Sequence, residues 1–207
     1  MNGSMGKEGR SFFRPTKAMR ELLALWALAE TGRMSQHRLG RTIGVSSAMA
    51  HNYMQTLLRE EFVVVSGETN RTRRYVVTAK GCAYLTTLAR EYTRDIARMY
   101  SVVKTEIEKR LLRIYADGVQ KVVVFGAAET GELIFSAAKS TPLTIVGWVD
   151  NDIAKHKYRF GDLHVCPPNT IESYSPDAVL IASSGKTDEI HRQLRHLSKK
   201  GINVVTL

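Results

Sequence analysis

Residues 121–131 read KVVVFGAAETG, and they define the architecture of the C-terminal half of the chain. The apolar run 121–125 is short and unbroken, as expected for a strand buried in a parallel sheet. Gly126 permits a tight turn, and a helical pattern starts directly after it. A second apolar run, 144–149, ends on Asp150, 24 positions after Gly126. Strand, glycine turn, helix, strand and acid in this order predict a βαβ dinucleotide-binding unit.

The turn and the acid supply most of the predicted ligand-binding residues. A helix that begins at the turn offers free N–H groups and the positive end of its dipole to a phosphate, and Asp150 can accept a hydrogen bond from a ribose hydroxyl. The predicted site comprises Gly126, Ala127, Ala128, Glu129, Thr130, Gly131, Asp150, Asn151, Ser183 and Ser184. Ala128 replaces the usual middle glycine, and Glu129 brings a negative charge to the phosphate position. A Rossmann-like domain that has lost its ligand therefore stays open as an alternative.

The N-terminal half carries the pattern of a winged helix. Residues 16–31 form an amphipathic helix capped by a threonine, and residues 35–44 form a short helix that ends on a glycine. A third helix begins at Ser46 or Ser47 and runs to about residue 61. Two β-rich runs then flank a basic tip, which predicts a hairpin. Helix, turn, helix and hairpin in this order are typical of DNA-binding modules.

The third helix and the hairpin tip supply the predicted DNA contacts. With Ala50, Tyr53 and Leu57 on the inward spacing, the opposite face is polar, and its amides can pair with adenine edges. The predicted DNA-binding residues are Ser46, Ser47, His51, Asn52, Gln55, Arg71, Arg73 and Arg74. This helix face lacks Lys and Arg, which favours A·T steps over guanine. Ordinary solvated surface is the alternative reading of both the helix face and the tip.

Charge separates the two halves of the chain. The net charge is +10, and residues 1–118 hold 20 Lys and Arg against 11 Asp and Glu, whereas residues 119–207 hold 10 against 9. A charge excess confined to the predicted winged helix is the footprint expected for double-stranded DNA as a partner. A basic surface without a partner is the alternative.

A long amphipathic helix is predicted between the halves, from residue 78 to about residue 115. Its apolar positions recur at steps of three or four: Leu85, Leu88, Tyr92, Ile96, Met99, Val103, Ile107, Leu111 and Ile114. Such a stripe favours a homodimer formed through the 85–114 helix, since paired heads read paired half-sites. A helix folded back on its own domain is the alternative.

Several classes of protein are disfavoured by the sequence. No stretch approaches the ~18 apolar residues that span a bilayer, so no membrane partner is expected and a cytoplasmic protein is predicted. The two cysteines, Cys82 and Cys166, lack metal-ligand spacing, and no metal site is predicted. Gly185-Lys186-Thr187 looks like the end of a phosphate-binding loop, but the upstream glycine is missing and the match is treated as coincidence.

The N-terminal half resembles the MarR-like winged-helix regulators over about residues 15–100. The resemblance is carried by Gly44-Val45-Ser46-Ser47, by residues 57–63 and by Tyr75-Val76-Val77-Thr78-Ala79-Lys80-Gly81. The chain departs from the family at Glu61, where a glycine usually precedes the first wing strand. The resemblance implies DNA binding.

The C-terminal half resembles the Rossmann domain that precedes catalytic domains in polysaccharide-biosynthesis enzymes, among them nucleotide-sugar dehydratases and sugar acyltransferases. The matching residues are Gly147-Trp148-Val149-Asp150-Asn151-Asp152, Gly161, Val165 and 177–182. This resemblance implies a nucleotide or nucleotide-sugar ligand. The whole architecture is also similar to the redox-sensing repressor Rex, which implies NAD(H) instead.

Together these patterns predict four segments: a disordered arm at 1–14, a winged-helix domain at 15–90, a linker and dimerisation helix at 91–117, and a Rossmann-like domain at 118–207. The expected fold is α+β followed by α/β, with a five-stranded, mostly parallel sheet in the order 3-2-1-4-5. The expected function is a transcriptional regulator that senses a nucleotide-type metabolite, with a nucleotide-sugar favoured and with surface-polysaccharide genes as the expected target. A nucleotide-sugar- or NAD-dependent enzyme and a scaffold protein are the alternatives; no catalytic residues can be assigned.

Overall fold

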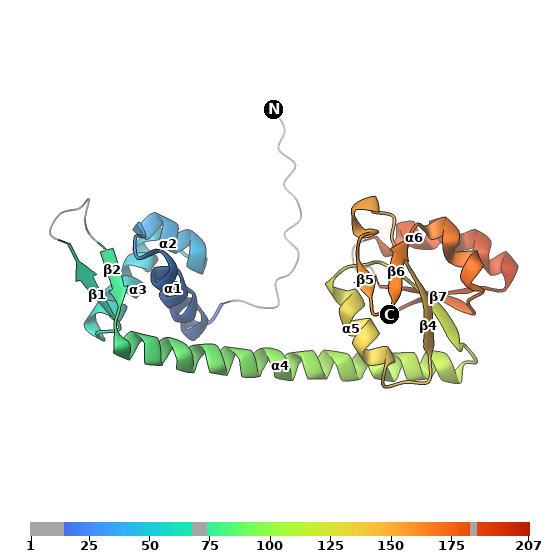
Figure 1. Ribbon diagram of the computed structural model, residues 1–207, viewed down its shortest axis with the longest axis horizontal. Helices are drawn as coiled ribbons and strands as arrows, with labels where there is room; N and C mark the ends of the chain where they lie inside the picture. The colour runs from blue at the N-terminus through green and yellow to red at the C-terminus, as the bar shows by residue number, and fades with distance from the viewer. Residues whose placement is uncertain (1–14, 68–73, 183–185) are drawn as a thin grey trace, which may run out of the picture. The chain divides into compact units, whose positions relative to one another are not determined.

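The computed structural model describes residues 15–67, 74–182 and 186–207, and it forms two compact units that meet in sequence between Ala97 and Arg98 (Figure 1). The predicted arm at 1–14 lies outside the described residues. Helix α4, Ala79–Ala116, is continuous and contributes its first half to unit 1 and its second half to unit 2. Among the described residues, no helix is long and apolar enough to cross a membrane.

Unit 1 contains the predicted helix-turn-helix and wing. Its elements are α1 Lys17–Thr31, α2 Gln36–Ile43, α3 Ser47–Arg59, β1 Val63–Ser66 and β2 Arg74–Val77, followed by the first half of α4. Side chains of Thr16, Ser35 and Ser46 accept hydrogen bonds from backbone N–H groups in the first turns of α1, α2 and α3. The predicted caps are therefore confirmed, and the third helix ends two residues earlier than predicted. Strands β1 and β2 pair antiparallel.

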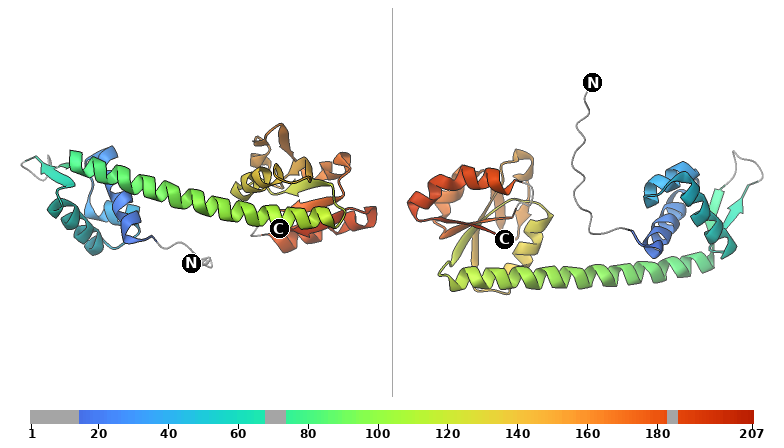
Figure 2. Two further views of the ribbon diagram at one scale, coloured as in Figure 1. Left: turned by 90° about the horizontal axis from the view of Figure 1, so that it is seen from below. Right: turned by 180° about the vertical axis from the view of Figure 1, so that it is seen from behind.

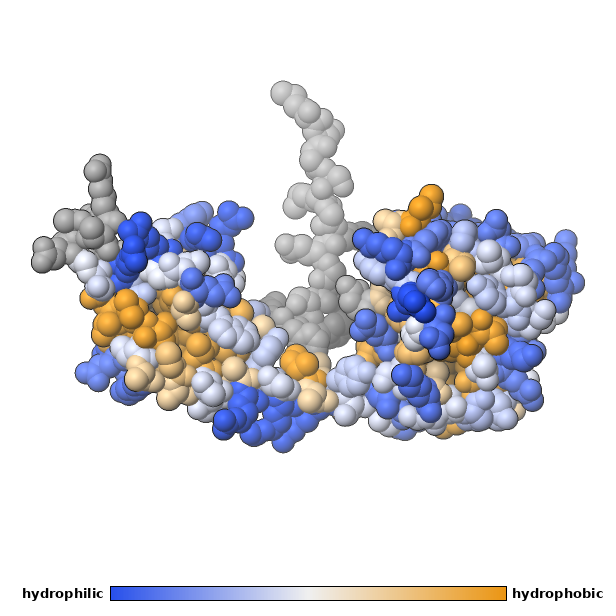
Figure 3. All heavy atoms as spheres, viewed as in Figure 1, coloured by the Kyte–Doolittle hydropathy of each residue, from blue (hydrophilic) through white to orange (hydrophobic). Residues whose placement is uncertain are grey.

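The core of unit 1 lies between the three helices, the base of the wing and the start of α4. Its buried members include Leu22, Leu25, Leu28, Leu39, Ile43, Ala50, Met54, Leu57, Val63 and Leu88. The inward face of α3 differs from the predicted one at a single place, because Met54 is buried and Tyr53 only half-buried. Hydrophobic side chains also reach the surface of this unit, shown in orange in Figure 3, and Val64, Val65 and Val76 of the wing are among the exposed ones.

The wing is entered through a strained residue. Glu61 has a φ of +58°, a left-handed conformation that L-residues with a side chain adopt at a cost. The Thr78 hydroxyl donates to the Glu61 carbonyl at 2.7 Å, which holds this bend against the start of α4. Glu61 occupies the position at which the MarR-like pattern has glycine, and the backbone angle explains that preference.

Unit 2 is built on a six-stranded sheet in the order β5-β6-β4-β3-β7-β8. The strands are β3 Lys121–Phe125, β4 Thr144–Val149, β5 Arg159–Phe160, β6 Leu163–Cys166, β7 Ala178–Ile181 and β8 Asn203–Thr206. Every pairing is parallel except that of β5 with β6. The prediction of five strands is wrong, because the sheet has a sixth strand, β5, at its edge. That strand has only two residues, which is too short for a period-two pattern, and a turn at Gly161 with φ +62° folds it onto β6.

Helices cover both faces of this sheet (Figures 1 and 2). Helix α5, Glu129–Ala138, and the second half of α4 pack on one face through Ile107, Leu111 and Ile134. Helix α6, Thr187–Leu194, and the 3-10 segments η2, Pro168–Tyr174, and η3, Arg195–Lys200, pack on the other. A further 3-10 turn, η1 Ile153–Lys155, follows β4. The predicted single helix over 187–199 is thus α6 followed by η3.

Candidate functional site

A cavity of about 370 Å³ opens where β3, β4 and β7 reach their carboxyl ends. We call it the lysine cavity. It is lined by Phe125, Gly126, Ala128, Thr130, Asp150, Asn151, Asp152, Lys155, Ala182, Lys186 and Ile190. Five of the predicted ligand-binding residues meet there, although they come from two segments of the chain. The position, at the carboxyl edge of a parallel sheet, is where open α/β folds bind ligands.

Asp150 is bound by three donors and is only 7% exposed. Its Oδ2 accepts from the Ala127 N–H at 2.7 Å and from Lys155 Nζ at 3.0 Å, and its Oδ1 accepts from the Asp152 N–H at 2.8 Å. Burial by itself would raise the pKa of Asp150, but these N–H groups and the Lys155 ammonium hold it below its ordinary value. Asp150 therefore braces the glycine turn, and Oδ1 keeps capacity for one more donor.

The turn itself is held by hydrogen bonds to both backbone groups of Gly126. Gly126 has a φ of +116°; its N–H donates to the Val149 carbonyl at 2.8 Å, and its carbonyl accepts from the Trp148 indole at 3.0 Å. Ala128 occupies the N-cap of α5 without a side chain that could cap the helix. The Gly131 N–H donates to the Ala128 carbonyl at 2.7 Å, and an anion at this helix start could accept from the N–H groups of residues 129 and 130.

Two predicted ligand residues have another role, and three cannot be placed. Ala127 and Gly131 are buried and do not line the lysine cavity. A Cβ at Gly131 would come within 2.9 Å of Trp148 and 3.0 Å of Phe160, so this glycine permits close packing of α5 on the sheet. Ser183, Ser184 and the side chain of Glu129 lie outside the described residues.

Two lysines were missed by the sequence reasoning. Lys155 ends η1 and reaches Asp150, and Lys186 precedes α6 on the opposite side of the lysine cavity. Lys186 belongs to the Gly-Lys-Thr tripeptide at 185–187, which resembles the end of a phosphate-binding loop. That resemblance is the sequence signal that could have identified Lys186 as a ligand-binding residue. The positive charges of Lys155 and Lys186 balance the negative charges of Asp150 and Asp152. The two ammonium groups are also possible partners for an anionic ligand.

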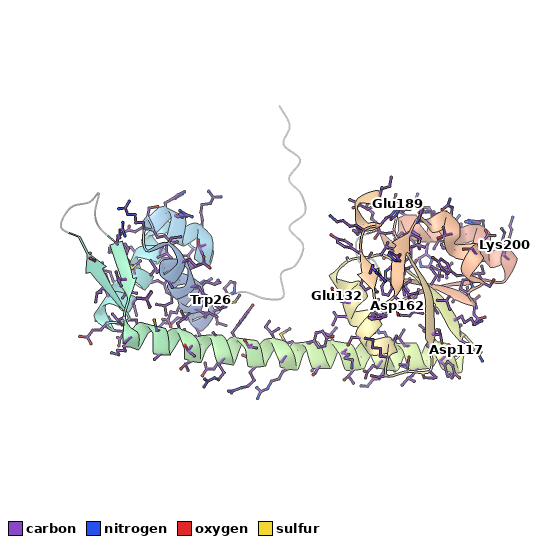
Figure 4. All side chains as sticks on the ribbon, viewed as in Figure 1. Trp26, Asp117, Glu132, Asp162, Glu189 and Lys200 are labelled. Carbon is purple, nitrogen blue, oxygen red and sulfur yellow. The ribbon has the colours of Figure 1, made fainter. Side chains whose placement is uncertain are left out.

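A neighbouring hollow of about 480 Å³ shares Ala128 and Lys155 with the lysine cavity. Its other lining residues include Glu132 on α5, labelled in Figure 4, together with Tyr158 and Arg159. Tyr158 is 47% exposed and offers an aromatic face for stacking. A ligand longer than a phosphate could extend over Lys155 into this hollow.

In unit 1, the predicted polar face of α3 is exposed. Ser47, His51, Asn52 and Gln55 all reach the surface, while the Ser46 side chain caps the helix. Arg74 is exposed on β2, and Arg71 and Arg73 lie outside the described residues. His51 Nδ1 lies 2.8 Å from Gln36 Nε2, which ties the face of α3 to α2.

Helix α2 adds basic residues that the sequence reasoning did not include. His37, Arg38, Arg41 and Thr42 line a shallow hollow on its surface. In a helix-turn-helix the first helix crosses the DNA backbone while the second enters the major groove. Arg38 and Arg41 are therefore suited to phosphates, beside the amides of α3.

The middle of α4 carries an exposed apolar stripe. Leu88 packs into the core of unit 1 and Ile107 into that of unit 2. Between them, Tyr92, Ile96, Met99 and Val103 are 36%, 49%, 38% and 42% exposed.

The family model described as C2185-like, N-terminal, matches residues 118–204. Among solved structures, UDP-D-quinovosamine 4-dehydrogenase from Vibrio fischeri is 20% identical and aligns over 42% of this chain and 77% of its own, with a TM-score of 0.38. The Mycobacterium tuberculosis MarR family protein Rv2887, in complex with salicylic acid, is 17% identical over 47% and 74% of the two chains, with a TM-score of 0.38.

MepR, a transcription regulator of the Staphylococcus aureus multidrug efflux pump MepA, is 11% identical over 47% and 77% of the two chains, with a TM-score of 0.35. A search of the curated proteins finds no match. The family model covers less than half of the chain, and the fold is compatible with a winged helix joined to a Rossmann-like domain.

Proposed function

We propose that this chain is a DNA-binding transcriptional regulator whose C-terminal unit binds a nucleotide-type ligand, with a nucleotide-sugar favoured. The observation that carries the proposal is the lysine cavity at the glycine turn, in a chain whose other unit exposes a polar recognition helix. The excess of basic residues lies in the half that contains that helix.

DNA binding is supported by the different side chains that α2 and α3 expose: arginines on α2 and amides on α3. Arginines fix a protein on the phosphate backbone, whereas amides read base edges in the major groove. Arg38 and Arg41 of α2 are suited to the first task, and Asn52 and Gln55 of α3 to the second. The wing arginines, Arg74 among them, would extend the phosphate contacts.

Dimerisation is part of the proposal. An exposed apolar stripe on α4 is poorly suited to water, and a second copy of the same helix would cover it. Two copies would then present two recognition helices to two half-sites, as helix-turn-helix dimers do.

Ligand binding is supported by the charges in the lysine cavity. Lys155, Lys186 and the first N–H groups of α5 suit a phosphate, and Asp150 Oδ1 can accept a ribose hydroxyl. Tyr158, next to Lys155, offers a stacking surface for a base. NAD(H), which the resemblance to Rex implies, carries the same phosphate and ribose groups and remains the alternative ligand.

Thermal-shift measurements of the full chain test the ligand, with UDP, UDP-glucose, NAD⁺, NADH and coenzyme A as probes. A ligand at 100 times its Kd raises the free energy of unfolding by about 2.7 kcal/mol. We expect a shift with UDP-glucose that Lys186→Ala abolishes and that Lys199→Ala, on η3 away from the cavity, retains. No shift with any of these probes would contradict the proposal. Turnover of UDP-glucose or NAD⁺ in the same samples would favour an enzyme instead.

A further inference from the structure

A second cavity, which we call the apolar cavity, adjoins the ligand turn in unit 2. It has a volume of about 510 Å³, within the range of small-molecule sites. Its lining comes from α4, from the first turn of α5, from the carboxyl ends of β7 and β8 and from the start of α6. The residues are Val102, Val103, Glu106, Ile107, Arg110, Thr130, Ile181, Ala182, Thr187, Thr206 and Leu207.

Three polar side chains of this cavity, those of Glu106, Arg110 and Thr206, have partners within the protein. Arg110 Nε lies 3.8 Å from Glu106 Oε1 on the same helix, and the Thr206 hydroxyl lies 2.8 Å from His191 Nε2. What they leave open to an occupant is mainly aliphatic, with Val102 at 70% and Val103 at 42% exposure. A sugar would lose its hydrogen bonds to water here without replacement, whereas an alkyl chain would gain from burial.

The apolar cavity adjoins the lysine cavity, because Thr130 and Ala182 line both. The lysine cavity offers Lys155, Lys186 and the first turn of a helix beside Asp150 and Asp152, and the apolar cavity offers a mainly aliphatic surface with one Glu106–Arg110 pair. A single molecule that fills both must carry an anionic group at one end and an apolar group at the other.

We propose that the ligand of this chain is amphipathic: a phosphate or diphosphate in the lysine cavity that carries an alkyl or prenyl chain in the apolar cavity. This inference rests on the lysine cavity being the ligand site of the proposed function. It keeps the phosphate of the proposed ligand and names a hydrocarbon chain, in place of a nucleoside, as the group attached to it. The tail contacts Val102 and Ile107, so a bound ligand touches the helix whose first half packs in unit 1. It can bias that helix only by binding one arrangement better than another.

Isothermal titration calorimetry of the full chain with inorganic phosphate, butyl phosphate and octyl phosphate tests this inference, with the chain-bearing probes below their micellar concentrations. Each fully buried methylene strengthens binding by roughly fourfold. We therefore expect octyl phosphate to bind at least ~10-fold more tightly than butyl phosphate, even with partial burial. Lys186→Ala should weaken both alike and leave their ratio unchanged.

Two variants probe the apolar cavity itself. Thr206→Trp fills it from the end of β8, and Asn203→Trp, at the start of the same strand and outside its lining, is the control. Val102→Asp puts a charge at its exposed rim without touching the core, and Leu112→Asp, on the same helix, 44% exposed and outside the lining of both cavities, is the matched control. Thr206→Trp and Val102→Asp should remove the gain from chain length, and the two controls should keep it.

Equal affinities for butyl and octyl phosphate would overturn the inference, as would a gain that survives both cavity variants. If those variants instead turn a dimer into a monomer in sedimentation and leave the ratio unchanged, a second copy occupies the cavity and the inference is wrong. A thermal shift with UDP-glucose but no chain-length effect would support the nucleotide ligand and contradict the amphipathic one. Binding of octyl phosphate without any response to nucleotides would support the amphipathic ligand and contradict the nucleotide.

Discussion

At the scale of single residues, Glu61 stores strain that can be released. The left-handed conformation costs a residue with a side chain about 1–2 kcal/mol of folding free energy, and a glycine there would avoid this cost. Glycine is also freer in the unfolded chain, which offsets about 0.4–1 kcal/mol of that stabilisation. We expect Glu61→Gly to raise the free energy of unfolding by about 0.5–1 kcal/mol, measured by calorimetry. Glu60→Gly is the control: Glu60 has a φ of −78°, so glycine there should destabilise. A lower melting temperature for Glu61→Gly would show that the left-handed angle carries no strain.

A second prediction concerns the half-buried Tyr84 and the buried Glu21. The Tyr84 hydroxyl donates to Glu21 Oε2 at 2.7 Å, and burial, followed by the hydrogen bond and charge of Glu21, raises the pKa of Tyr84 to about 12. Tyr84→Phe leaves a buried carboxylate without this donor and should cost about 1–3 kcal/mol. Replacing both partners, as Tyr84→Phe with Glu21→Leu, should recover part of that loss in urea unfolding. A double variant no more stable than Tyr84→Phe alone would contradict this account.

The same pair has a consequence in alkali. In the unfolded chain Tyr84 ionises near pH 10, whereas in the folded protein it stays neutral to about pH 12. The contribution of the pair is therefore complete below pH ~10 and is lost as the pH rises toward 12. Phenolate absorbance at 295 nm should show Tyr84 among the tyrosines that titrate late, and Tyr84→Phe should remove one tyrosine from that late step.

Asp150 predicts a dependence of stability on acid pH. Its folded pKa is lowered, so its contribution is complete above the unfolded pKa of about 3.9 and is lost as the pH falls through the lower folded value. Asp150→Asn should cost about 1.5–3 kcal/mol at pH 7, as the charged hydrogen bonds are lost, and should flatten the fall in stability below pH 4. Asp162→Asn, at a fully exposed carboxylate labelled in Figure 4, should leave both unchanged. If Asp150→Asn and the parent protein unfold at the same acid pH, Asp150 does not stabilise the glycine turn.

At the scale of elements, the stripe on α4 decides the oligomeric state. Ile96→Glu places a charge in the centre of the proposed dimer interface, where an unpaired carboxylate would have to be desolvated. We expect this variant to sediment as a monomer at concentrations at which the parent is a dimer. Arg94→Glu, on the opposite face of the helix, is the control and should remain dimeric. A parent that is monomeric at high concentration would refute the dimer.

Helices α2 and α3 make separable contributions to DNA binding. Each phosphate contact adds about 0.9 to the slope of log affinity against log salt concentration. Arg38→Ala with Arg41→Ala should therefore reduce the slope by about 2 and weaken binding to all sequences alike, measured by fluorescence anisotropy. Asn52→Ala should weaken preferred sites and leave the salt slope in place. Arg192→Ala with Lys199→Ala in unit 2 should change neither property.

At the scale of the whole molecule, the proposal requires that ligand and DNA affect each other. If UDP-glucose changes the DNA affinity by some factor, DNA must change the affinity for UDP-glucose by the same factor, and typical couplings are about 5–150-fold. We expect Lys186→Ala to keep DNA binding and to lose its response to the ligand. DNA binding that is insensitive to a ligand shown to bind would separate the two units functionally.

The sequence by itself determined the features that depend on near neighbours. The caps at Thr16, Ser35 and Ser46, the long apolar stripe of α4 and the strand–turn–helix at Gly126 all follow from spacing within a few residues. Local hydrogen bonds and the helical and strand periods act at that range, so a single sequence shows them.

Only the tertiary structure decided what lies together. The two-residue strand β5 exists because β6 offers it an edge, and Gly131 matters because Trp148 and Phe160 stack beneath it, 3.8 Å apart. Lys155 and Lys186 share a cavity because β4 and β7 end at the same edge of the sheet. The strand order that brings these ends together arises from contacts between residues far apart in the chain. Such contacts cannot be predicted from the pattern of neighbouring residues.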